Sequence, residues 1–98
     1  MLLTISPLAE SDLENIADFI ARDNPRRALS FIQEIRAQCL QIAQKPSMYR
    51  RRTELGDDIR SCTHGKYLIY FSDTPDEVTI IRVLHSARDL PSIFGSVD

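Results

Sequence analysis

Apolar and polar residues in the second half of the chain form blocks that predict a β-hairpin. Tyr67–Phe71 is apolar or aromatic at every position, and Val78–Leu84 is interrupted only by Thr79 and Arg82. β-Branched and aromatic residues dominate both runs, as is typical of strands. Ser72–Glu77, which separates the two runs, has the composition of a turn. Nearly continuous apolar runs also indicate that both strands lie inside a sheet that is covered on at least one face.

The N-terminal segment predicts a strand followed by a helix. Met1–Ile5 is a short apolar run, which we interpret as a strand at or near a sheet edge. Ser6 and Pro7 then predict a helix start, because the hydroxyl can cap the first turn and proline needs no N–H there. The apolar face of this helix follows a spacing of three and four residues, through Ala9, Leu13, Ile16, Ala17 and Ile20.

A second helix start lies at Asn24 and Pro25. The residue before a proline resists helical geometry, so the pattern restarts there, and we expect a helix over Arg26–Gln44 that Pro46 ends. Its apolar stripe comprises Ala28, Phe31, Ile32, Ile35, Cys39 and Ile42. Two helices with so short a link predict an antiparallel helical hairpin, whose joint apolar face needs a sheet to cover.

The remaining segments complete the predicted fold. Ser47–Asp57 has the composition of a loop, Asp58–His64 is interpreted as a strand, and a short helical turn is expected within Ser86–Asp98. The predicted order is therefore strand, helix, helix, strand, strand, strand. Helices followed by a run of strands are typical of a two-layer α+β domain with a mostly antiparallel sheet.

Composition narrows the class of protein. The 98 residues predict a single domain, 1–98, and carry a formal net charge of −2 at pH 7. This balance excludes a general basic nucleic-acid binder, and we expect no direct sequence-specific binding of nucleic acid. No apolar run approaches the roughly 20 residues of a membrane span, and Met1–Ser6 lacks the length and basic start of a signal peptide. We therefore expect a cytoplasmic protein without membrane association.

Several enzyme classes are disfavoured by the residues present. Cys39 and Cys62 have neither disulfide nor metal spacing, and we interpret them as buried thiols. The two imidazoles, His64 and His85, have no ligand at helical spacing. The sequence also contains no Gly-x-Ser-x-Gly motif and no glycine-rich phosphate loop. We expect neither a cofactor nor a bound metal.

RNA cleavage by attack of a 2′-hydroxyl requires a base, an acid and cations around the phosphate. The residues that a sheet might gather for it are Arg60, Lys66, Arg82, His85 and Arg88. Alternation along a strand, however, predicts that Arg82 shares a face with Val78, Ile80 and Leu84, whereas His85 points the other way with Ile81 and Val83. The pair is split unless the strand bends. This favours a non-catalytic Arg82, which binds a partner, forms a salt bridge at the core, or lies on a solvated edge.

Tyr67 and Tyr70 fall on opposite faces of their strand, so we expect one in the core and the other exposed. An exposed tyrosine beside an arginine is suited to anchor a partner protein. The candidate partner-binding residues are therefore Arg60, Tyr67, Arg82, His85 and Arg88, and no residue is assigned a catalytic role.

Five pieces of the chain form an ordered set: SDLENIADFI at Ser11–Ile20, NPRRALSFIQEI at Asn24–Ile35, Pro46, IRSCTHGKYLIYF at Ile59–Phe71, and VTIIRVLHSARD at Val78–Asp89. No single segment is a sharp signature, but the ordered set with its spacing covers nearly the whole chain. This set resembles the ParE branch of the RelE/ParE superfamily of toxins from type II toxin–antitoxin modules. Four of the candidate residues match the family pattern: Arg60, Arg82, His85 and Arg88.

The resemblance implies the same fold and an antitoxin encoded nearby, whose disordered segment folds onto the toxin. It also implies a target, because ParE-like toxins poison DNA gyrase whereas RelE-like toxins cleave mRNA on the ribosome. The RelE-like pattern has a basic cluster and a tyrosine near the C-terminus, and no tyrosine follows Arg88 here. We therefore expect a gyrase-binding toxin. The alternatives are a ribosome-dependent mRNA endoribonuclease and an inactive homologue that acts as a binding partner.

Overall fold

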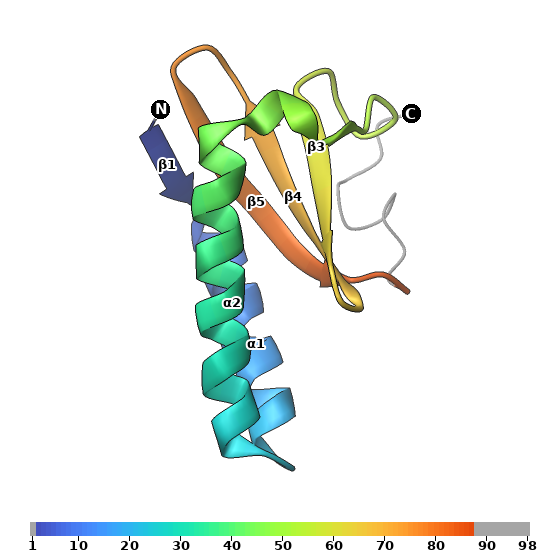
Figure 1. Ribbon diagram of the computed structural model, residues 1–98. Helices are drawn as coiled ribbons and strands as arrows, with labels where there is room; N and C mark the ends of the chain where they lie inside the picture. The colour runs from blue at the N-terminus through green and yellow to red at the C-terminus, as the bar shows by residue number, and fades with distance from the viewer. Residues whose placement is uncertain (1, 88–98) are drawn as a thin grey trace.

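Two helices cover one side of a five-stranded sheet in the computed structural model, which describes residues 2–87 (Figure 1). The strand order is β1-β5-β4-β3-β2, with β1 parallel to β5 and every other pair antiparallel. The predicted α+β class is confirmed, as is the helical hairpin on a mostly antiparallel sheet. The elements are β1 (Leu2–Ile5), α1 (Pro7–Ala21), α2 (Pro25–Gln44), the 3₁₀ turn η1 (Pro46–Met48), β2 (Arg50–Arg51), β3 (Ile59–His64), β4 (Tyr67–Asp73) and β5 (Glu77–His85).

Both helices begin where the sequence predicts. The Ser6 hydroxyl accepts a hydrogen bond from the Ala9 N–H at 3.0 Å, and it also donates to the Ile81 carbonyl at 2.9 Å. One side chain therefore caps α1 and ties its first turn to β5. The Asn24 side chain caps α2 in the same way, by accepting from the Arg27 N–H at 3.1 Å. The two helices lie side by side, and their joined ends extend beyond the strands (Figure 1).

The segment predicted as a loop contains more structure than expected. Within Ser47–Asp57, part of η1 and the two-residue strand β2 are formed, and β2 pairs with Arg60 and Ser61 of β3. A strand of two residues is too short for alternation to reveal. The helical turn expected in Ser86–Asp98 falls on residues 88–98, which lie outside the described residues.

A β-bulge in β5 changes which residues face the helices. Tyr70 pairs with Arg82 whereas its neighbour Phe71 pairs with Ile80, so Ile81 is the extra residue. Ile80 and Val83 consequently both belong to the core beneath the helices. The prediction that Arg82 shares a face with Val78 and Ile80 is therefore wrong, because the alternation changes phase at the bulge. Val83 and His85 share a face opposite Arg82, as predicted, whereas Ile81, which was predicted on that face too, is the extra residue of the bulge.

The core lies between the hairpin and the sheet. Its members include Leu13 and Ile16 of α1, Phe31 and Ile35 of α2, and Ile69, Phe71, Val78, Ile80 and Val83 of the sheet. Tyr70 is also fully buried, with the Arg52 guanidinium 5.6 Å from its ring centre, whereas Tyr67 is half-buried against the core. One of the two tyrosines lies in the core, as expected, but the other, Tyr67, is half-buried rather than exposed. Neither described helix is long and apolar enough to cross a membrane.

Both cysteines are buried free thiols, as predicted, and burial raises the pKa of Cys39 to about 11.

The raised pKa of Cys39 makes the stability of the fold depend on pH. Burial of the neutral thiol contributes its full stabilisation below the ordinary cysteine pKa of about 8.5, and this contribution is lost as the pH rises through 11. We expect the unfolding free energy to fall with pH between about 9 and 11, more steeply than in a Cys39→Ala variant. The difference should approach about 1.4 kcal/mol per pH unit. Urea unfolding across this range measures it, and parallel slopes would contradict it.

Candidate functional site

Arg82 forms a two-point ion pair with Asp12 of α1. Its Nε lies 2.8 Å from Asp12 Oδ2 and its Nη2 lies 2.9 Å from Oδ1. The Val83 N–H donates to the same Oδ2 at 3.0 Å. The hydrogen bonding to Asp12 is also the main reason that the pKa of Arg82 is raised. Arg82 therefore forms the salt bridge that the sequence analysis left as one of three interpretations.

The contact from Asp12 satisfies a backbone N–H of β5 that would otherwise pair with a neighbouring strand. Within the described residues, β1 pairs with β5 only as far as Ile80, so residues 81–85 have no strand beside them on that edge. Two side chains of the α1 region take over this role. The Ser6 hydroxyl donates to the Ile81 carbonyl, and the Asp12 carboxylate accepts from the Val83 N–H. The helix thus satisfies backbone groups at an otherwise open edge.

Arg60 is held elsewhere in the sheet. Its Nε lies 3.1 Å from Asp73 Oδ2, and its Nη1 donates to the Tyr49 carbonyl at 2.8 Å. Arg60 pairs in register with Phe71, whereas Arg82 pairs with Tyr70, the next residue along β4. Successive residues of a strand point to opposite faces, so the two arginines leave the sheet in opposite directions. The structure does not bring them together.

Tyr67 and His85 do lie together, at the end of the sheet beneath the middle of the hairpin. His64, Tyr67 and His85 are consecutive partners across β3, β4 and β5. The Tyr67 ring is 5.4 Å from the His85 ring and 5.2 Å from Phe31, which itself lies 5.8 Å from His64. His85 Nδ1 accepts a hydrogen bond from the Ala87 N–H at 3.1 Å, which places the proton of the neutral ring on Nε2. Arg88 lies outside the described residues.

Comparison with known proteins identifies the family of this chain. The family model described as ParE toxin of type II toxin-antitoxin system, parDE, matches residues 3–90. The chain belongs to the ParE toxin family. A chain in the solved structure of the chromosomal ParDE TA system from P. aeruginosa is 24% identical to it, with a TM-score of 0.74, and the match covers 87% of this chain and 95% of that chain. At this identity the likeness shows the shared fold. A comparison with curated proteins finds no match.

The charges of this ParE-family chain are largely paired around the candidate site. Arg60 and Arg82 each face a carboxylate, and within residues 2–87 no contact joins either imidazole directly to an arginine or lysine. The same residues contain no group of three or more side chains that could hold a metal ion. Lys66 also belongs to this end of the sheet, because it precedes Tyr67 and its carbonyl accepts from the Ser86 N–H at 2.9 Å.

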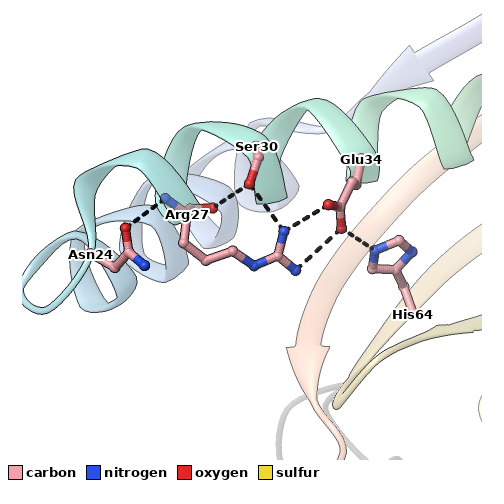
Figure 2. A network of polar contacts seen from close by, with 5 residues as sticks. All are labelled: Asn24, Arg27, Ser30, Glu34 and His64. Carbon is pink, nitrogen blue, oxygen red and sulfur yellow. Dashed lines mark hydrogen bonds and ion pairs between the residues drawn. The ribbon is translucent and has the colours of Figure 1, made fainter.

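A polar network attaches α2 to His64, the last residue of β3 (Figure 2). Glu34 accepts from Arg27 Nη1 at 2.6 Å and lies 3.2 Å from His64 Nε2, and Ser30 also contacts Arg27. These contacts, chiefly the one from Arg27, hold the pKa of Glu34 below its ordinary value. Ionised Glu34 therefore stabilises the folded state at any pH above the ordinary glutamate pKa. This stabilisation is lost as the pH falls through the lowered pKa of Glu34 in the folded protein.

We expect the Glu34 titration midpoint to rise toward the ordinary value when Arg27 is replaced by methionine, because the largest cause of the lowered pKa is removed. The carboxyl ¹³C shift of Glu34 followed by NMR against pH measures this. Arg26→Met is the matched control, since Arg26 is exposed and forms no ion pair within residues 2–87. An unchanged midpoint in the Arg27 variant would show that the network does not form in solution.

Sequence reasoning missed one feature of this family member, an open depression that we call the α1–β5 groove. It has a volume of about 310 Å³ and lies between Asn15 and Phe19 of α1 and Tyr67 and His85 of the sheet; Asp12, Ile16, Val83 and Leu84 complete its lining. Only Tyr67 and His85 were among the predicted site residues. The available signal was Phe19, an aromatic residue outside the apolar stripe of a predicted amphipathic helix.

Proposed function

We propose that this chain is the toxin of a type II toxin–antitoxin module, that it inhibits DNA gyrase by binding in the cytoplasm, and that its cognate antitoxin neutralises it. Membership of the ParE family supports the toxin role and implies an antitoxin partner. The pairing of Arg60 and Arg82 with carboxylates supports inhibition by binding, because ribonuclease chemistry needs cations free to face a phosphate.

The five candidate residues enter this proposal in different ways. Tyr67 and His85 line the accessible groove and are proposed to contact a partner directly. Arg60 and Arg82 are proposed to act through the strands and helix that they hold together. A contact role for Arg88 stays a prediction from the sequence.

Controlled expression in a bacterial host tests the proposal. We expect the chain alone to arrest growth and to reduce the supercoiling of a reporter plasmid, because gyrase maintains negative supercoils. Co-expression of the protein encoded beside it should restore both. An expressed, folded chain that leaves growth and plasmid topology unchanged would contradict the proposal. Arrest with normal supercoiling and fragmented mRNA would replace it with the endoribonuclease.

A further inference from the structure

We infer that the α1–β5 groove binds a free mononucleotide, with its base stacked on Phe19 and its phosphate at the end of the sheet beside Lys66 and His85. The inference rests on the groups that line and border the groove and does not depend on the toxin assignment. Three observations carry it: an exposed aromatic ring on one wall, polar groups without partners, and an uneven distribution of charge around the groove.

The aromatic wall of the groove is Phe19 on α1. Its side chain is 64% exposed, although α1 already buries Leu13 and Ile16 of a different face against the sheet. On the opposite wall, the Tyr67 and His85 rings lie 5.4 Å apart and nearly perpendicular to each other. An exposed ring offers a stacking surface to a nucleobase of any kind, because every base has an aromatic face. The groove therefore presents aromatic rings on both of its walls to a flat ligand.

Three polar groups of the lining have no hydrogen-bond partner within residues 2–87: the Asn15 amide, the Tyr67 hydroxyl and His85 Nε2. Nε2 of the neutral His85 ring carries the proton, because Nδ1 accepts from the Ala87 N–H. The Asn15 amide offers a donor beside an acceptor, which matches the edge of a nucleobase. A few polar groups in an otherwise apolar depression are typical of a small-molecule site.

Positive charge borders the groove at the end of the sheet. Lys66 precedes Tyr67, and its carbonyl accepts from the Ser86 N–H at 2.9 Å, next to His85. The Lys66 ammonium forms no ion pair within the described residues. A cation beside an N–H donor is suited to hold a phosphate group. Asp12, the carboxylate of the lining, does not oppose this because Arg82 neutralises it.

The size and the outer border of the groove limit the ligand to a single nucleotide. A volume of about 310 Å³ lies at the lower limit for small-molecule pockets, which leaves no room for a dinucleotide. Glu14 and Asp18 lie one turn apart on the exposed side of α1, and neither forms an ion pair within residues 2–87. Their negative charge repels the further phosphates of a polynucleotide, so a free mononucleotide is favoured over a nucleic-acid strand.

Adenosine monophosphate and adenosine, titrated separately into the purified chain, test this assignment. We expect the wild-type chain to bind the monophosphate with a Kd of about 1 mM or tighter by isothermal titration. Phe19→Ala should weaken both ligands by at least about fivefold, because stacking on the ring is lost. His85→Ala should weaken the monophosphate by about tenfold and adenosine by less than about twofold, because it removes a donor to the phosphate alone.

Leu29→Ala is the matched control, since Leu29 is also 64% exposed but lies on α2 away from the lining of the groove. It should change neither affinity, and circular dichroism confirms that each variant is folded. NMR adds a second measurement, in which the Asn15 side-chain amide signal should shift with adenosine monophosphate and stay unchanged with inorganic phosphate.

Four results would overturn the inference. They are no binding of adenosine monophosphate at about 10 mM, equal losses in the Phe19 and Leu29 variants, competition by inorganic phosphate as strong as by the monophosphate, and tighter binding of a single-stranded DNA oligonucleotide. None of these measurements involves growth arrest, gyrase or an antitoxin. Failure of the nucleotide site therefore leaves the proposed function intact, and failure of the proposed function leaves the nucleotide site intact.

Discussion

Replacing Phe31 with alanine is expected to lower the free energy of unfolding by about 4 kcal/mol. The Phe31 side chain is 5% exposed and packs against the rings of His64 and Tyr67, so its removal leaves a cavity between α2 and the end of the sheet. In a domain whose total stability is only about 5–15 kcal/mol, this loss should remove a large share of that stability. Urea unfolding followed by circular dichroism measures the change.

Phe19→Ala is the matched control for Phe31→Ala. Both residues are phenylalanines of the same hairpin, but Phe19 is 64% exposed and its truncation should change the unfolding free energy by no more than about 0.5 kcal/mol. Equal effects at the two positions would contradict the packing described for the hairpin.

The second large effect is expected at Asp12, where alanine should lower the unfolding free energy by about 3 kcal/mol. The carboxylate accepts two hydrogen bonds from Arg82 and one from the Val83 N–H, and it is only 10% exposed. Its removal leaves a partly buried guanidinium and a backbone N–H without their acceptor. Arg82→Ala should also destabilise the fold, since it leaves Asp12 unpaired, and toxicity of that variant must be compared at equal amounts of folded protein.

Glu10→Ala is the control for Asp12→Ala on the same helix. Glu10 pairs with Arg36, but both side chains are nearly half exposed, so solvent screens the interaction and the expected loss is under about 1 kcal/mol. A double-mutant cycle between Asp12 and Arg82 then isolates the coupling of the buried pair. Coupling no larger than that of the exposed pair would show that the Asp12–Arg82 contact does not hold α1 to β5.

Features that depend on local chemistry were predicted well from the sequence. The helices begin at Pro7 and Pro25 because Ser6 and Asn24 cap them, and both signals are contained within two adjacent residues. The apolar strands are found because nearly continuous runs of β-branched and aromatic residues extend over five or more positions. The order of these elements then fixes the α+β class, because an amphipathic hairpin needs one face of a sheet to cover.

Features that depend on contacts between distant segments were not predicted. The bulge at Ile81 has no glycine or proline to mark it, and it alone changes the face to which Arg82 belongs. In the sequence, Asp12 looks like an ordinary acidic residue in an early turn of a helix. Its partner, Arg82, lies 70 residues further along the chain. Periodicity assigns a residue to a face of its own element, but it does not identify which side chain of another element will meet it there.

The candidate site was predicted only in part for the same reason. Tyr67 and His85 are close because β4 and β5 pair in one register, which the hairpin prediction contained. Arg60 and Arg82 were both named as candidate partner-binding residues, but each forms an ion pair with a carboxylate of another segment, Asp73 and Asp12 respectively. A charged residue in an apolar strand therefore predicts that its side chain makes a specific contact. The sequence does not show whether that contact lies within the chain or with a partner protein.

The proposed function requires that this ParE-family chain acts by binding DNA gyrase and makes or breaks no covalent bond itself. The most direct test adds purified, folded chain to gyrase, ATP and relaxed plasmid, beside a parallel reaction with ribosomes translating an mRNA. The account predicts loss of supercoiling or accumulation of cleaved gyrase–DNA complexes, reversed by the antitoxin, with the mRNA intact. Undisturbed supercoiling together with discrete, codon-positioned cuts in the mRNA would contradict it.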